Sequence, residues 1–195
     1  MTTQPLSVAV IIGSARGGRL GDKVGHWIAG QARSRDDMTV DVIDVVEHPL
    51  PVAMPAMGEE PAEHVRTVKD ALSARLAAAD AFVVVTPEYN HSFPASLKNI
   101  IDWHLQEWAA KPVGLVSYGG MGGGLRAAEH LRQVFAEVHA MTVREMVSLH
   151  NPWSSFSHAD DAPEGADAAA KKLLDQVAWW GRALRTARAE QPYAL

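Results

Sequence analysis

The sequence contains no cysteine among its 195 residues. Disulfide bonds, thiolate metal sites and a cysteine nucleophile are therefore excluded. The chain also lacks an apolar run of membrane-spanning length, and residues 1–5 lack the charged-then-apolar order of a secretory signal. We therefore expect a cytoplasmic protein that makes no contact with a membrane.

Positive charge is in short supply as well. Eighteen lysines and arginines face 23 aspartates and glutamates, which gives a net charge of −5, and the arginines are scattered along the chain. A nucleic-acid partner requires a basic track that follows the phosphate backbone. No nucleic-acid partner is expected.

Familiar catalytic motifs are also missing. The nine histidines include no His-Glu-x-x-His pair and no close cluster, and Ser117 is not framed by Gly-x-Ser-x-Gly. The sequence therefore predicts neither a metal site nor a catalytic side chain.

Apolar and amphipathic segments alternate along the chain. The apolar segments predict five strands, at 8–12, 39–46, 81–86, 113–117 and 140–147. Amphipathic segments between them predict helices, one of which begins near Pro94, and a polar loop over 148–163 precedes the last. This alternation predicts an α/β fold of one domain, residues 1–195, with a parallel sheet covered by helices on both faces.

The five strands differ in polarity. The first, third and fourth are continuously apolar, as strands covered on both faces must be, whereas the second and fifth carry charges such as Asp41, Asp44, Arg144 and Glu145. Central positions for the apolar strands and right-handed crossovers give the strand order 2-1-3-4-5. In that order the winding reverses between strands one and three, which leaves a ligand crevice at their carboxyl ends.

The loop after the first strand has the composition of a phosphate-binding loop. Its spacing matches neither Gly-x-Gly-x-x-Gly nor the triphosphate loop that ends in Gly-Lys-Ser/Thr. The candidate donors are a hydroxyl, two guanidinium groups and the backbone amides at the start of the next helix, namely Ser14, Arg16, Arg19, Leu20 and Gly21. The alternative is an ordinary strand-to-helix connection with solvated arginines.

Three loop motifs carry a resemblance to a known family. They are Gly-Ser-Ala-Arg at 13–16, Pro-Glu-Tyr-Asn at 87–90 with the Ser-x-Pro-x-x-Leu-Lys-Asn pattern that follows, and the glycine-rich segment 117–124. Together they resemble the NADPH-dependent FMN reductases, a flavodoxin-like family of three-layer α/β proteins that includes quinone, azo-dye and chromate reductases. All three motifs fall at loops that the strand order already places together.

The resemblance implies both cofactors and a reaction. Hydride would pass from NADPH or NADH to bound FMN, and electrons would then pass to a small-molecule acceptor such as a quinone, an azo compound, a metal ion or free flavin. The first loop would hold the phosphate. The ring would lie against the two later loops, which contribute Pro87, Glu88, Tyr89, Asn90, Ser117, Tyr118, Gly119 and Gly120.

Several neighbouring side chains allow two interpretations. We expect His91 and Glu88 to be structural hydrogen-bonding groups, although Glu88 could instead meet a partner chain. Trp103, His104 and Trp108 indicate either a packed core face or, as the family implies, the interface of a homodimer or tetramer. Two aromatic residues in the polar loop, Trp153 and Phe156, either pack on the core or overhang a neighbouring site.

Two other functions compete with the reductase. A flavodoxin-type electron carrier would bind FMN, meet protein partners and use no pyridine nucleotide. Its phosphate loop would be rich in hydroxyl groups, whereas this one carries arginine. A non-catalytic nucleotide-binding protein would be colourless when purified.

Overall fold

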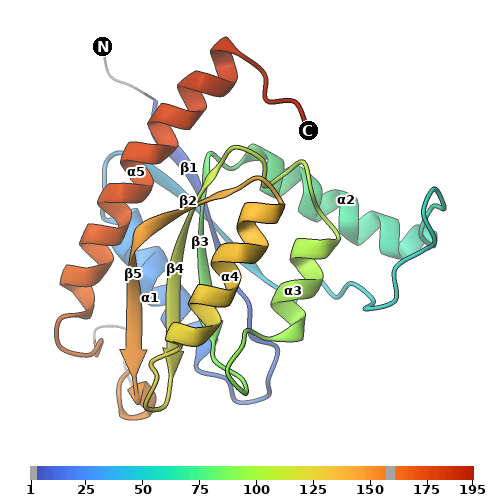
Figure 1. Ribbon diagram of the computed structural model, residues 1–195. Helices are drawn as coiled ribbons and strands as arrows, with labels where there is room; N and C mark the ends of the chain where they lie inside the picture. The colour runs from blue at the N-terminus through green and yellow to red at the C-terminus, as the bar shows by residue number, and fades with distance from the viewer. Residues whose placement is uncertain (1–3, 157–160) are drawn as a thin grey trace.

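The computed structural model describes residues 4–156 and 161–195, so the middle of the polar loop expected over 148–163 lies outside the described residues. Five strands form one parallel sheet in the order β2-β1-β3-β4-β5, which confirms the predicted order (Figure 1). The strands are β1 (Leu6–Ile12), β2 (Met38–Asp44), β3 (Ala81–Pro87), β4 (Pro112–Gly119) and β5 (Met141–His150). The helices are α1 (Gly21–Arg33), α2 (Glu63–Ala78), α3 (Ala95–Asp102), α4 (Leu125–Glu137), α5 (Ala166–Glu190) and the short 3-10 helix η1 (Pro152–Ser154).

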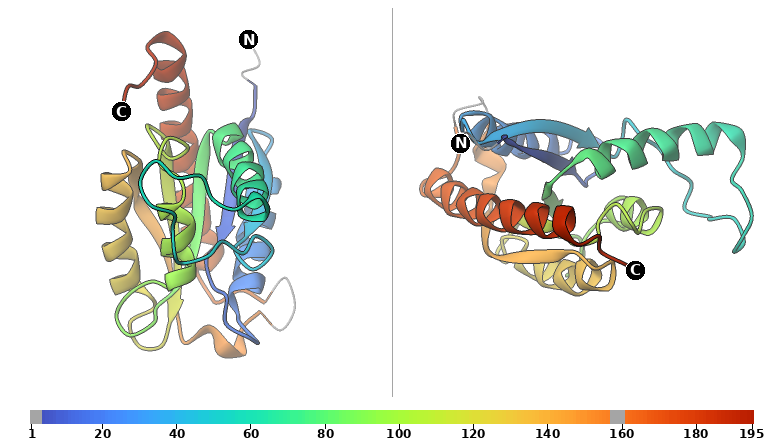
Figure 2. Two further views of the ribbon diagram at one scale, coloured as in Figure 1. Left: turned by 90° about the vertical axis from the view of Figure 1, so that its right-hand side faces the viewer. Right: turned by 90° about the horizontal axis from the view of Figure 1, so that it is seen from above.

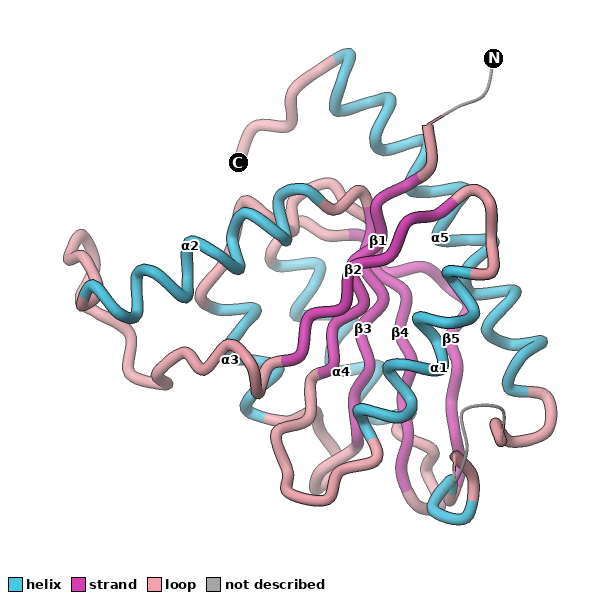
Figure 3. Tube along the Cα trace, turned by 180° about the vertical axis from the view of Figure 1, so that it is seen from behind, coloured by secondary structure: helices cyan, strands magenta, loops and turns pink. Residues whose placement is uncertain are grey.

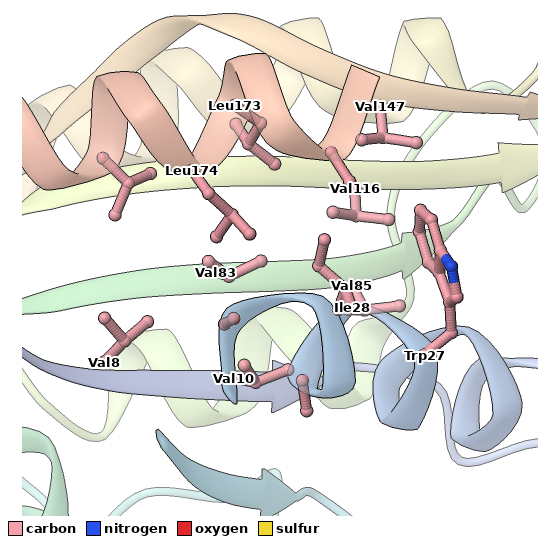
Figure 4. Close-up of a cluster of buried hydrophobic side chains, with 14 of the residues drawn as sticks. Val8, Val10, Trp27, Ile28, Val83, Val85, Val116, Val147, Leu173 and Leu174 are labelled. Carbon is pink, nitrogen blue, oxygen red and sulfur yellow. The ribbon is translucent and has the colours of Figure 1, made fainter. Parts of the chain in front are cut away.

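Two apolar cores cover the two faces of the sheet. One core packs α1 and α5 against side chains such as Val8, Val10 and Val83 (Figure 4). The other packs α2, α3 and α4 against the alternate residues of the same strands, such as Ile11 and Val84. In Figure 1, α5 lies to the left of the sheet and α3 and α4 to its right, and the left view of Figure 2 shows α2, α3 and α4 from the front. Because successive side chains of a strand point to opposite faces, a continuously apolar strand requires this three-layer arrangement.

β5 is longer than the apolar pattern indicated. Ser148, Leu149 and His150 were expected in a loop, but they continue the strand and pair with residues 117–119 of β4. Val147 and Leu149 are buried, whereas Ser148 and His150 point to the other face and hydrogen-bond to the loop that follows β4. The hydrogen-bond partners of these two polar residues lie in a loop that is distant in the sequence. The apolar pattern therefore could not indicate that they belong to the strand.

The aromatic cluster after α3 is a core face. Trp108 is fully buried, and His104 and Trp103 expose only 3% and 6% of their surface within the single chain. The Trp103 indole donates to the carbonyl of Pro51 at 2.9 Å. The interpretation of these three residues as a subunit interface is therefore wrong.

The two aromatic residues after β5 behave differently. Phe156 is buried and its ring lies 5.7 Å from that of Trp27. Trp153, in η1, leaves 61% of its surface exposed. In the described part of the chain, no helix combines the length and the apolar character needed to cross a bilayer.

Candidate functional site

Three loops that are far apart in the sequence meet at the carboxyl edge of the sheet. They are the cradle loop after β1 (13–20), the loop after β3 (88–94) and the glycine loop after β4 (120–124); Figure 3 shows this edge from behind. Ser14 Oγ and Tyr89 Oη lie 3.0 Å apart, and the amide of Glu88 donates to the carbonyl of Tyr118 at 3.0 Å. The predicted convergence of the three loops is therefore confirmed.

The helix that follows the cradle loop, α1, begins at this edge without a side-chain cap. Leu20 is the N-cap of α1 and makes no side-chain capping bond, so the amides of the first turn have no such partner. Gly21 opens the helix, and a Cβ there would lie 2.7 Å from Tyr118 Oη. Unpaired amides and the helix dipole favour an anion at this end. The cradle thus has the local features of an anion site.

A buried hydroxyl without a partner lies beneath this helix end. Among the described residues, the buried side-chain atoms that lack a hydrogen bond are Tyr118 Oη and Asp22 Oδ1. Burial raises the pKa of Tyr118, so the phenol keeps its proton throughout the physiological range. Buried polar groups are usually hydrogen-bonded, and an orphan is a sign of an absent partner such as a ligand or water. Tyr118 therefore contributes a hydroxyl near the cradle; its ring is buried.

The two arginines of the cradle have different environments. Arg19 makes a two-point ion pair with Asp44 at the end of β2, with Nη1 2.8 Å from Oδ1, and it also donates to the carbonyl of Ser14. The hydrogen bonds that Arg19 donates to the Asp44 carboxylate raise the pKa of Arg19. Asp44 is 7% exposed and is thus an internal partner rather than a solvated edge charge. Arg16 is exposed and forms no ion pair within the described chain, so its guanidinium is available to a ligand.

A side chain that the sequence did not reveal joins the second and third loops. Arg126 Nε lies 2.8 Å from Glu88 Oε1, its amide donates to Glu88 Oε2 at 3.2 Å, and its Nη1 lies 2.6 Å from His91 Nε2. Glu88 and His91 are thus structural hydrogen-bonding groups, as predicted. The one available signal was position, since a cation in the first turn of α4 is unfavourable to the helix dipole unless an anion compensates it.

The glycine loop is shaped partly by the protein's own packing. A Cβ on Gly123 would lie 2.4 Å from Ser148 Oγ, and one on Gly124 would lie 2.6 Å from Ser117 Cβ. Both residues also have positive φ, at 56° and 84°. At Gly120, by contrast, the nearest atom to an added Cβ is 3.8 Å away. Gly120 therefore presents open backbone, whereas Gly123 and Gly124 are required by internal contacts.

The remaining predicted residues supply backbone more than side chains. Ser117 is fully buried and its hydroxyl donates to the carbonyl of Gly123 at 2.9 Å. Pro87 ends β3 and is buried, and Asn90 has a φ of 50° in the tight turn that follows. Gly119 lies against Glu88, with 3.5 Å from an added Cβ to Glu88 Cβ. Of these residues Asn90 and Gly120 are exposed, whereas Pro87, Ser117 and Gly119 are buried and brace the loops.

The sequence is similar to those of known reductases. Residues 6–154 match the family described as NADPH-dependent FMN reductase. An NAD(P)H-dependent FMN reductase of Schizosaccharomyces pombe is 37% identical over 151 residues, which cover 74% of this chain and 73% of the relative. A 2-hydroxy-1,4-benzoquinone reductase of Burkholderia sp is 29% identical over 186 residues, or 91% of this chain and 97% of the relative.

The fold of a solved structure is also similar. FerB, a flavoenzyme NAD(P)H:acceptor oxidoreductase from Paracoccus denitrificans, has a TM-score of 0.68 at 22% identity, over 93% of this chain and 98% of that one. This likeness shows a shared fold. The family match covers most of the chain and includes all three loops of the site. The chain therefore belongs to the NADPH-dependent FMN reductase family.

Proposed function

We propose that this protein is an FMN-dependent oxidoreductase that takes hydride from NADPH or NADH and passes electrons to a small-molecule acceptor such as a quinone. Its family and the reductases it resembles support the reaction class. The observation that carries the proposal is the convergence of an uncapped helix end, a buried unpaired hydroxyl and a free arginine at one edge of the sheet.

The cradle fits the phosphate of FMN. The first amides of α1, at Leu20 and Gly21, and the Ser14 hydroxyl supply neutral donors, and Arg16 supplies a charge-assisted contact. The Tyr118 hydroxyl is buried beneath this end of the helix, near Ser14. Arg19 contributes indirectly, because its ion pair with Asp44 connects the cradle loop to the end of β2.

The other two loops suit a flat ring. The backbone at Pro87–Asn90 and at Ser117–Gly120 supplies polar contacts, and Tyr89 and the open Gly120 lie at the same edge. When bound, FMN supplies the redox chemistry, which leaves the protein to provide orientation and electrostatics.

One open site that serves two substrates in turn should give ping-pong kinetics. We therefore expect parallel lines in double-reciprocal plots of initial rate with NADPH and a quinone as the varied substrates. Intersecting lines, which report a ternary complex, would contradict the shared site.

The function is tested by absorbance spectroscopy. Purified protein titrated with FMN should bind it, and anaerobic addition of NADPH or NADH should bleach the flavin band; the faster nucleotide is the preferred donor. Steady NADPH oxidation with a quinone acceptor separates the reductase from a flavodoxin-type carrier. Binding without bleaching by either nucleotide would refute the enzyme.

We also propose that the protein is a homodimer, alone or paired into a tetramer. The segment before α2 projects from the body together with that helix (Figure 2, right), and it exposes 81% of Val52, 50% of Met54 and all of Met57. Apolar side chains on a projecting segment indicate a surface that another subunit covers. Light scattering at micromolar concentration should give at least twice the mass of 21.1 kDa; the mass of a single chain would contradict this.

The single sheet with its two cores supports treating residues 1–195 as one flavin-binding domain. The cytoplasm, with its supply of reduced nicotinamide nucleotides, is where we expect the reaction to occur. Fractionation of the native cells tests this placement.

A further inference from the structure

The loop after β3 contains a turn with an unfavourable backbone. Tyr89 and Ser92 exchange two backbone hydrogen bonds, of 2.8 and 3.0 Å, and the two residues between them have positive φ, 50° at Asn90 and 70° at His91. This is the geometry of a type I′ turn, in which glycine is strongly preferred at the second central position. Histidine there adopts a left-handed conformation that its own backbone disfavours.

Contacts from α4 compensate for this cost. Arg126 Nη1 lies 2.6 Å from His91 Nε2, and the same guanidinium is fixed by Glu88 at 2.8 Å. Because a guanidinium only donates, Nε2 must accept, and the imidazole in this contact must be neutral with its proton on Nδ1. A protonated ring would place two cations in contact.

The 89–92 turn also positions Tyr89, a residue of the site. Tyr89 opens it, and the Tyr89 hydroxyl lies 3.0 Å from Ser14 Oγ in the cradle. Arg126 also lies over the glycine loop, where a Cβ on Gly122 would meet its Nη2 at 2.3 Å. Arg126 is therefore in contact with two of the three loops, and the 89–92 turn links it to the third.

We propose that His91 and Arg126 are positioning residues for FMN: the neutral imidazole, held by Arg126, keeps the 89–92 turn in its left-handed form, and protonation of His91 releases it. The proposal rests on the proposed function, since FMN is the ligand whose binding it affects. Neither side chain is assigned a contact with the flavin.

The groups that face His91 are few within the described chain. Arg126, from α4, contacts it directly, and Glu88, the first residue of the loop after β3, pairs with Arg126. His130, also on α4, contacts the last residue of the turn, with Nδ1 3.2 Å from Ser92 Oγ. A positive charge on the His91 imidazole would repel the Arg126 guanidinium, so acidification should weaken FMN binding.

The test compares FMN dissociation constants at pH 8 and pH 5.5, measured by quenching of flavin fluorescence. The FMN phosphate also titrates in this range, so each variant is compared with the parent at both pH values. Between pH 8 and pH 5.5, the FMN dissociation constant of the parent should rise about tenfold more than protonation of the FMN phosphate alone would raise it. His91→Gly should lose this extra pH dependence, because glycine satisfies the turn without the imidazole.

Two further measurements separate the proposal from simpler explanations. His130→Gln should keep the pH dependence of the parent, since His130 is not the group that Arg126 holds. In FMN-free protein, hydrogen exchange of the Ser92 amide, corrected for its intrinsic pH dependence, should accelerate at pH 5.5 in the parent but not in His91→Gly.

The outcomes are distinct. Equal pH dependence in the parent and His91→Gly, or transfer of the effect to His130→Gln, overturns the proposal. A parent that does not bind FMN at either pH refutes the proposed function instead.

Discussion

The two cradle arginines should respond in opposite ways to the same substitution. Arg19→Met removes the partner of Asp44, a carboxylate that is 7% exposed. Breaking a buried ion pair from one side costs about 3–5 kcal/mol. The Arg19 and Asp44 side chains keep 17% and 11% of their surface exposed, which places the expected loss of stability at the lower end, about 3 kcal/mol. Arg16→Met removes an exposed guanidinium and should change stability by less than about 0.5 kcal/mol.

Flavin binding should show the reverse order. Loss of a charge-assisted phosphate contact costs about 1.5–3 kcal/mol, so Arg16→Met should weaken FMN binding by about 10- to 150-fold. Arg19→Met, assayed where it remains folded, should weaken binding less than Arg16→Met does. Urea unfolding of the FMN-free protein and fluorescence titration with FMN give the two quantities independently.

A double variant completes the comparison. In Arg19→Met/Asp44→Asn the unpaired charge is gone, so part of the stability lost in Arg19→Met should return. If Arg19→Met leaves stability unchanged but sharply weakens FMN binding, Arg19 turns to the phosphate and the assignment of the two arginines is refuted.

The fold offers further tests. Burial lowers the pKa of Lys111 from 10.5 to about 8. Between these two pH values the unfolded chain binds more protons than the folded chain, so the free energy of unfolding should rise from pH 8 to 10.5. Urea titrations should show this rise, and Lys111→Met should flatten it. Gly25→Ala should destabilise the protein by about 1–2 kcal/mol, since its Cβ would lie 2.5 Å from the buried Ile12 side chain. The matched Gly30→Ala, where nothing lies within 4 Å, should instead raise the midpoint of thermal unfolding through a gain of up to about 1 kcal/mol in helix propensity.

Much of the architecture follows from local patterns. Continuously apolar strands must be covered on both faces, so the polarity of each strand already indicates whether it is central or at an edge, and the strand order follows. That order places the loops after the first, third and fourth strands at one edge. The position of the site could therefore be predicted without coordinates.

The role of each side chain in the site could not be predicted in the same way. Arg16 and Arg19 look alike in the sequence, and only the fold brings Asp44, 25 residues further along the chain, to one of them. Likewise, the partner of Glu88 is 38 residues away on α4.

The difference has a physical cause. Secondary structure and burial depend on periodic runs of apolar residues, which a sequence displays directly. Ion pairs, unpaired hydroxyls and the space around a glycine depend on which distant atoms lie within a few ångströms, and that is settled only when helices and strands pack. The sequence by itself determined the sheet, its order and the edge at which three candidate loops meet; the tertiary structure decided which of the polar groups at that edge are already paired within the protein.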